Sequence, residues 1–244
     1  KNFGFCHKAG IIMPISSLPN KYGIGSFGKE AYDFIDFLSA TGQKCWQVLP
    51  LNPTSYGDSP YQSPASMAGN PYFIDLDILH KKWLLTKEEL AENLNRSDRV
   101  DYGWLFTTRY KVLRLAHERF VLRGEENSDY YRSYLKKSKD WLPDYSLFMA
   151  LKVHYNYCQW TLWSEEHRDY KQAMARKADF ESEMGFWRWI QYEFDAQWRE
   201  VVAHAHKCGI LIIGDMPIYV AHDSMDVWAA PEQFLLDENY NPTV

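Results

Sequence analysis

The chain has 244 residues, of which 46% are hydrophobic and 24% are charged, a composition typical of a globular protein with a buried core and not of a disordered one. Its net charge of −5, with both signs mixed along the chain, argues against nucleic acid or an anionic membrane as the main partner. No apolar stretch approaches the roughly 20 residues of a membrane-spanning helix, and we expect a cytoplasmic protein.

The beginning of the chain predicts a strand, a helix and a second strand. Ile11–Leu18 is an apolar run that predicts a short strand, and Cys45–Leu51 predicts another. Between them, Lys29–Thr41 has apolar residues on one helical face, with Ser26 as a candidate N-cap and Gly42 placed to end the helix. Two strands joined by one helix are expected to be parallel with a right-handed connection.

Gly23–Gly28 fits the G-x-G-x-x-G pattern of dinucleotide-binding proteins, between a strand and a helix as that motif requires. The fit is poor in detail, because Pro19–Tyr22 separates the motif from the strand. The second strand also runs into Leu51 and Asn52 and not into an acidic residue that would bind a ribose. A nucleotide site is therefore the weaker interpretation of these glycines.

Gly57–Pro71 (GDSPYQSPASMAGNP) follows the second strand and combines turn residues with hydrogen-bonding groups and one tyrosine. A pyranose has an apolar C–H face and a rim of hydroxyls, so a sugar site combines a flat aromatic ring with nearby polar groups. Tyr61 would supply the ring, and the polar groups would come from Asp58, Ser59, Gln62 and Asn70. The same residue types also make ordinary loops, in which a tyrosine packs against the protein.

The middle of the chain is rich in helix formers. We expect helices in Lys87–Leu94, Leu105–Phe120 and Ser146–Tyr157, which together predict a helical subdomain inserted between two strands. Interleaved charged and aromatic residues at Asp129–Tyr134 indicate a solvated helix face.

A long amphipathic helix follows, with apolar residues at helical spacing from Phe186 to Ala205, and Gly209 is placed to end it. The next apolar run, Ile210–Ile213, predicts a third strand, and Asp215 comes just after it. The C-terminal end of a barrel strand is an active-site position, although aspartate is also common there as a turn residue or helix cap.

His204, His206 and Cys208 form the one cluster with a metal-like composition. Residues two apart on a helix point to different faces, and no further ligand group lies nearby in sequence, so we expect a polar helix end and no metal. The four cysteines are far apart, which favours reduced thiols: Cys6, Cys45, Cys158 and Cys208.

Three segments resemble, in the same order, the 4-alpha-glucanotransferases of glycoside hydrolase family 77, also called amylomaltases or disproportionating enzymes. They are Ile15–Gly28, the Tyr56–Pro71 loop and Ile213–Trp228 (IGDMPIYVAHDSMDVW). The resemblance implies an α/β fold, the N-terminal portion of a (β/α)8 TIM barrel, with residues 80–160 as a helical subdomain between strands 2 and 3. Residues 1–79 and 161–244 would be barrel parts, and the glycines near the N-terminus would be turn residues.

The resemblance also implies an activity, the transfer of α-1,4-glucan segments between maltooligosaccharides by a retaining double displacement without a cofactor. Relatives continue well beyond the position of Val244, where their catalytic nucleophile and acid/base lie, so we expect no catalytic residue in this chain and an incomplete barrel. An amylase-type α-glucan hydrolase and a catalytically inert glucan-binding fragment remain alternatives. The sequence does not indicate an oligomeric state.

Several residues of this chain resemble the substrate-binding residues of the family. Tyr61 resembles the tyrosine that stacks on glucose at the cleavage point, and Asp215 resembles the aspartate that supports the substrate subsite. Tyr56 and Tyr102 resemble a pair that holds a second stretch of glucan in some relatives, although packing would also explain Tyr102. Weaker candidates for substrate contact are Ser59, Gln62 and Asn70.

Two smaller groups match the family as well. Trp160 and Trp163 resemble a tryptophan pair, but Ser164 stands where relatives commonly have proline, which puts the local loop geometry in question. The loop after the third strand matches at three further positions, which we expect to shape the cleft: Asp223, Ser224 and Trp228.

Overall fold

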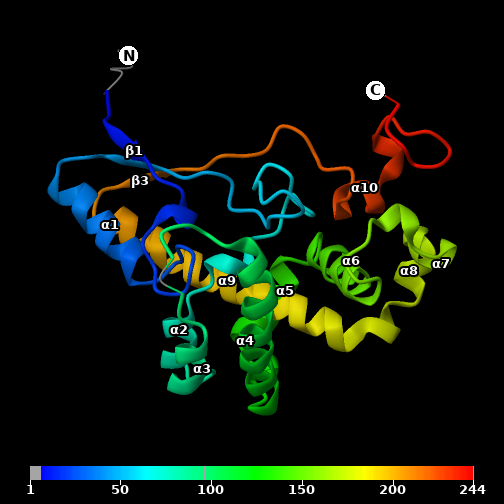
Figure 1. Ribbon diagram of the computed structural model, residues 1–244, viewed down its shortest axis with the longest axis horizontal. Coiled ribbons are helices and arrows are strands. Elements are labelled where there is room, and N and C mark those ends of the chain that lie inside the picture. Colours follow the sequence, from blue (N-terminus) through cyan, green and yellow to red (C-terminus); the bar gives the residue numbers. More distant parts are fainter. Residues whose placement is uncertain (1–6, 96, 244) are drawn as a thin grey trace. The chain divides into compact units, whose positions relative to one another are not determined.

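The protein, described here by a computed structural model for residues 7–95 and 97–243, has a parallel three-stranded sheet. The strands are β1 (Gly10–Ile12), β2 (Cys45–Gln47) and β3 (Leu211–Ile213), in the order β1-β2-β3. Helix α1 lies beside this sheet (Figure 1). The parallel pairing of the first two strands and the position of the third were both predicted from the sequence.

The first two strands are shorter than predicted. β1 ends at Ile12, and a 3-10 turn occupies Ile15–Ser17 within the expected strand. Pro14 precedes that turn and has no N–H group to continue the hydrogen-bonding ladder. β2 ends at Gln47, although Val48 N still donates to the carbonyl of Ile213 at 3.0 Å.

Helix α1 (Lys29–Ala40) buries Ala31, Ile35 and Leu38 on one face, as the apolar spacing predicted. Gly42 follows it with φ +79°, the left-handed conformation expected of a glycine that ends a helix. The predicted N-cap was wrong, because Gly28 occupies that position and Ser26 hydrogen-bonds elsewhere.

The expected helical segments are all present, with somewhat different ends. Helix α9 (Glu181–Lys207) is the longest helix in the described part of the chain, and Gly209 beyond it has φ +73°. Helix α5 (Asp129–Lys137) contains the expected solvated face, but only part of it is exposed, since Tyr130 is 83% exposed whereas Tyr131 is buried. The helices after α1 are α2 (Leu76–Lys81), α3 (Lys87–Glu92), α4 (Tyr102–Leu122), α5 (Asp129–Lys137), α6 (Leu142–His154), α7 (Glu165–Arg168), α8 (Tyr170–Ala175), α9 (Glu181–Lys207) and α10 (Met225–Ala229).

The chain forms two compact units. The first unit holds the sheet and comprises the described residues up to Leu51, Tyr72–Val112 and Phe194–Met216. The second unit comprises Asn52–Pro71, Leu113–Glu193 and the described residues from Pro217 on. The boundary between the units falls inside α4 and inside α9. The division into parts at residues 79 and 160 therefore remains a prediction.

Arg109 of α4 joins three segments of the first unit. Its buried guanidinium donates through Nη1 to the carbonyls of Tyr72 at 2.9 Å and Ile74 at 3.3 Å. Through Nη2 it donates to the carbonyl of Tyr22 at 2.9 Å. Burial lowers the pKa of Arg109 to about 10 while the nearby Asp75 opposes that shift, so the guanidinium stays protonated at neutral pH.

Aromatic side chains form much of the core of the second unit. Trp163 and Trp228 lie edge to face at 5.9 Å between ring centroids, and both contact Phe148 of α6. Such contacts bury large apolar area and add specific geometry to it. The high tryptophan and tyrosine content of the sequence therefore serves packing here. The largest fully buried aromatic residues of this unit are Trp160, Trp187, Trp189, Trp228, Tyr145, Phe148 and Phe186.

None of the helices in the described part of the chain combines the length and the apolar character needed to cross a membrane. The described cysteines, Cys45, Cys158 and Cys208, are free thiols, as the sequence predicted. Cys6, for which a reduced thiol was also predicted, lies outside the described residues.

Candidate functional site

The loop Asn52–Pro71 has no strand, and its only helical residue is Pro71, where a 3-10 turn begins. One buried side chain, that of Asn52, holds the second half of the loop together. Asn52 Nδ2 donates to the carbonyls of Ala65 at 3.3 Å, Ser66 at 2.7 Å and Ala68 at 3.1 Å. Because one side chain donates to three backbone carbonyls within four residues, Asn52 fixes the path of the backbone there. The loop is thus an ordered platform.

Two further anchors come from helices of the same unit. Gln191 of α9 accepts from Gly69 N through Oε1 at 2.7 Å and donates to Gly69 O through Nε2 at 2.9 Å. Asp226 of α10 accepts from the Ser66 N–H at 2.9 Å and from the Ser66 hydroxyl. Met225 N also donates to the carbonyl of Pro64 at 2.8 Å. Both ends of the segment from Pro64 to Gly69 are therefore held.

The tip of the loop presents the predicted sugar-binding groups to solvent. Tyr56 is 99% exposed and Tyr61 is 44% exposed. Gly57 has φ +97° and Asp58 has φ +59°, which turns the chain sharply between the two tyrosines. Ser59 Oγ accepts from Tyr61 N at 3.3 Å and so helps to shape this turn. An exposed ring on an anchored loop is suited to stacking on a sugar.

Gln62 and Asn70, the two amides predicted to bind substrate, lie in different surroundings. Gln62 is exposed and follows Tyr61 directly in the chain. Asn70 is only 1% exposed and lies at the anchored end of the loop. A direct contact of Asn70 with a ligand therefore has less support than one of Gln62, and both remain predictions.

Asp215 lies two residues beyond the end of β3, as the sequence predicted. It is half-buried, and its Oδ1 accepts from the Met216 N–H at 2.8 Å. Asp215 belongs to the first unit and Tyr61 to the second, so their meeting in one cleft remains a prediction.

Tyr102 and Tyr56 likewise fall in different units. Tyr102 begins α4, where its ring lies 6.2 Å from that of Tyr72 between centroids. This contact favours packing for Tyr102, whereas Tyr56 is almost fully exposed. A second glucan site formed by the pair stays a prediction.

Asp223, expected to shape a cleft, forms a partly buried ion pair within the second unit. Lys152 Nζ lies 2.7 Å from Asp223 Oδ2 and also donates to the carbonyls of Tyr157 at 3.2 Å and Cys158 at 2.8 Å. Asp223 Oδ1 accepts from Trp160 N at 3.2 Å. These bonds tie the segment after β3 to the C-terminal end of α6, so the observed role of Asp223 is structural.

Ser224, Trp228 and Ser164 also make structural contacts. Ser224 is buried and caps α10 by accepting from Val227 N at 3.3 Å. Trp228 Nε1 donates to the carbonyl of His167 at 3.0 Å. At Ser164, the backbone N–H donates to Tyr155 Oη at 3.3 Å and the hydroxyl lies 2.7 Å from the same atom. Proline has neither an N–H nor a hydroxyl group, so Ser164 makes two hydrogen bonds that a proline at this position could not make.

The protein itself fills the space over the glycine motif. A Cβ on Gly25 would lie 1.8 Å from the carbonyl oxygen of Ile15, and one on Gly28 would lie 2.1 Å from Asp75 Oδ2. The carboxylate of Asp75 therefore occupies the position beside the N-terminus of α1 where a dinucleotide-binding protein holds phosphates. A phosphate there would face a like charge, which favours the turn interpretation over a nucleotide site.

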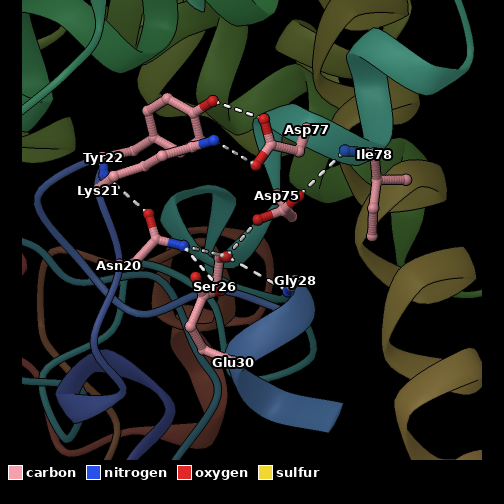
Figure 2. A network of polar contacts seen from close by, with 9 residues as sticks. All are labelled: Asn20, Lys21, Tyr22, Ser26, Gly28, Glu30, Asp75, Asp77 and Ile78. Carbon is pink, nitrogen blue, oxygen red and sulfur yellow. Dashed lines mark hydrogen bonds and ion pairs between the residues drawn. The ribbon is translucent and has the colours of Figure 1, made fainter. Parts of the chain in front are cut away.

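Asp75 is the centre of a polar network in the first unit (Figure 2). Ser26 Oγ donates to Asp75 Oδ2 at 2.7 Å and accepts from Asn20 Nδ2 at 3.0 Å and Gly28 N at 3.3 Å. Asp75 Oδ1 accepts from Ile78 N at 3.0 Å and so caps α2. Because the Ser26 hydroxyl is used in this network, it does not cap α1 as predicted.

Residues 13–241 match the sequence profile of the family described as 4-alpha-glucanotransferase. The chain belongs to this 4-alpha-glucanotransferase family. It is 47% identical to the 4-alpha-glucanotransferase of Clostridium butyricum over 230 residues, which covers 93% of this chain and 47% of that protein. It is 42% identical to the Thermus thermophilus enzyme over 238 residues, covering 96% of this chain and 47% of the relative.

The fold of this 4-alpha-glucanotransferase family member agrees with a solved relative. An amylomaltase from Streptococcus agalactiae, solved in complex with acarbose, is similar with a TM-score of 0.88 and 38% identity. The similarity covers 97% of this chain and 48% of that one. The chain thus spans about half the length of the relatives that it matches.

Sequence reasoning missed the residues that hold the loop of this family member in place. Asn52 and Gln191 were not singled out, although Gln191 stands in the aromatic-rich segment Phe186–Phe194 next to Ile190, and Asn52 follows an apolar strand. A polar amide among buried apolar residues must find hydrogen-bonding partners inside the protein. The presence of an amide among apolar residues could have identified Asn52 and Gln191 from the sequence. It does not reveal which backbone groups the amide binds.

Proposed function

We propose that this chain is the glucan-binding part of an enzyme that transfers α-1,4-glucan segments between maltooligosaccharides. Family membership over residues 13–241 carries the proposal. The Streptococcus agalactiae relative was solved with acarbose, and we assign the same class of ligand to this chain. The exposed Tyr61 on an anchored loop supports this assignment by its chemistry. We expect the protein to be cytoplasmic.

The three strands would begin a (β/α)8 barrel, with a helical subdomain at residues 80–160 between strands 2 and 3. The sheet supports this, because its strands are parallel and follow their order in the chain. Its two outer strands expose apolar side chains, with Ile12 at 62%, Leu211 at 45% and Ile213 at 45%. Further strands of a full-length protein would cover these positions.

Transfer would proceed by a retaining double displacement without a cofactor. A carboxylate attacks the anomeric carbon while an acid protonates the leaving oxygen, and the hydroxyl of a second glucan then displaces the carboxylate. We place both catalytic carboxyl groups outside these 244 residues. In this chain, Tyr61 would stack on the sugar at the cleavage point, and Asp215 would hold its hydroxyls.

Incubation of the full-length protein with maltotriose distinguishes transfer from hydrolysis. Transfer breaks and remakes one glycosidic bond, so we expect glucose and longer oligosaccharides to form while the concentration of reducing ends stays constant. Hydrolysis adds one reducing end for each bond cleaved. A rise of reducing ends in step with glucose would support an amylase-type hydrolase instead, and glucan binding without any product would support an inert fragment.

For Tyr61→Ala we expect kcat/KM with maltotriose to fall about 10- to 100-fold, because loss of the stacking ring removes transition-state binding worth about 1.4 to 2.8 kcal/mol. The melting temperature should change little, since the residue is 44% exposed and lies in a loop outside the aromatic core. Tyr61→Phe should keep most of the activity because it keeps the ring.

Tyr130→Ala is the matched control, as Tyr130 is 83% exposed on α5 of the same unit and is not assigned to substrate binding. Its kinetics should equal those of the wild type. A Tyr61→Ala protein that melts several degrees lower but keeps full activity per folded molecule would show that Tyr61 is a packing residue.

A further inference from the structure

Three metal-ligating side chains from two distant segments meet on the surface of the first unit. Asp36 lies on α1, and His204 and Cys208 lie at the C-terminal end of α9, which Figure 1 shows in orange beside α1. His204 Nε2 is 2.7 Å from Asp36 Oδ1. Cys208 Sγ is 3.6 Å from the same oxygen and 3.7 Å from His204 Nε2. One nitrogen, one oxygen and one sulfur therefore face a common point.

These separations are close to those around a tetrahedral ion. With typical zinc bond lengths, the sulfur would lie about 3.6 Å from the nitrogen and about 3.5 Å from the oxygen, and these two atoms would be about 3.3 Å apart. Both observed distances to Cys208 Sγ agree within about 0.1 Å. The observed 2.7 Å between His204 Nε2 and Asp36 Oδ1 is the length of a hydrogen bond. This distance would increase by about 0.6 Å when an ion takes the place of the shared proton.

The ligand positions are held by neighbouring contacts. His204 and Cys208 are one helical turn apart, and Cys208 N donates to the carbonyl of His204 at 3.0 Å. Ser39 Oγ of α1 donates to the carbonyl of Cys208 at 3.0 Å. The ring of Tyr32 lies 5.0 Å from that of His204. Because these contacts join α1 to the end of α9, little rearrangement is needed to bind an ion.

We propose that Asp36, His204 and Cys208 bind a divalent ion of the zinc class, with a water molecule as the fourth ligand. A thiolate and an imidazole prefer such ions to Mg²⁺ or Ca²⁺, which take oxygen ligands. The side chain of Asp36 is 59% exposed and that of His204 is 27% exposed, which leaves a path for the ion and its water.

The position of the site indicates what the ion does. Cys208 lies just before β3, whereas Asp215 follows the other end of the same strand. Residues at the amino ends of barrel strands contribute to stability, and those at the carboxyl ends to chemistry. The ion would therefore cross-link α1 to the end of α9 and stabilise the first unit. It takes no part in the proposed transfer reaction, so either proposal can fail without the other.

The test is a titration of the reduced full-length protein with Co²⁺. We expect saturation at one equivalent with a thiolate-to-cobalt charge-transfer band, and loss of this band when Zn²⁺ displaces Co²⁺. C208S should lack the band, and H204Q and D36N should each bind Co²⁺ more than about 100-fold more weakly, because each loses a direct ligand. Zn²⁺ should raise the melting temperature of the wild type but not that of H204Q.

C158S and H206Q are the matched controls, because Cys158 is a free thiol of the second unit and His206 is exposed two residues from His204. Both should bind Co²⁺ like the wild type. No charge-transfer band in the wild type would overturn the proposal. So would a band that survives in C208S, one that disappears in C158S, or unchanged affinity in H204Q and D36N.

Discussion

Replacement of Arg109 by methionine is expected to lower the free energy of unfolding by about 3 kcal/mol. Methionine fills a similar space but donates no hydrogen bond, so the carbonyls of Tyr22, Tyr72 and Ile74 would lose the partner that Arg109 provides. The carboxylate of Asp75 would also lose a nearby positive charge. Urea denaturation of the wild type and the variant measures the change.

Arg132→Met is the control for this substitution. Arg132 lies on α5, is exposed, and bonds to Asn127 Oδ1 at 3.0 Å, so we expect a change within about 0.5 kcal/mol. Arg109→Lys should be intermediate, because one ammonium group does not reproduce the planar fork that reaches three carbonyls. If Arg109→Met proved as stable as Arg132→Met, the three hydrogen bonds would not contribute to the stability of the first unit.

Asp215→Asn in the full-length protein is expected to lower kcat for maltotriose disproportionation about 100-fold or more, with a much smaller change in KM. The amide keeps the size of the side chain and the acceptor oxygen that binds Met216 N, but it removes the charge. A group that holds sugar hydroxyls most strongly in the distorted transition state affects turnover more than ground-state binding.

Trapping of the glycosyl-enzyme with a mechanism-based reagent separates this supporting role from that of a nucleophile. We expect label on a carboxylate outside these residues, in the wild type and, more slowly, in Asp215→Asn. Asp140→Asn, a change at an exposed aspartate between α5 and α6, should leave the kinetics unchanged. Label on Asp215 itself would overturn both its assigned role and the placement of the catalytic centre.

The arrangement of the loop Asn52–Pro71 explains how one tyrosine can be exposed and still well positioned. The amides of Asn52 and Gln191 hold backbone groups on the second half of the loop, and Tyr61 lies just before that half. Because the backbone is fixed before a ligand arrives, stacking on Tyr61 needs little ordering of the chain. Loss of either amide should therefore weaken glucan binding without any change in the ring.

The sequence by itself determined the features that depend on neighbouring residues. Apolar spacing predicted α1, α9 and the parallel strands, and Gly42 and Gly209 marked helix ends because they adopt positive φ at little cost. Three motifs that resemble the family in the same order, in Ile15–Gly28, Tyr56–Pro71 and Ile213–Trp228, predicted the family. All of these signals lie within short segments, so they can be read without knowing how the chain folds.

The tertiary structure decided the contacts between segments far apart in the chain. The Ser26 hydroxyl bonds to Asp75, 49 residues away, and so does not cap α1. Asp36 meets His204 across 168 residues and so brings a carboxylate to the helix end that holds His204 and Cys208, which no local pattern indicated. Local periodicity indicates that a side chain faces inward, but the partner it finds there depends on how distant elements pack, and no short segment carries that information.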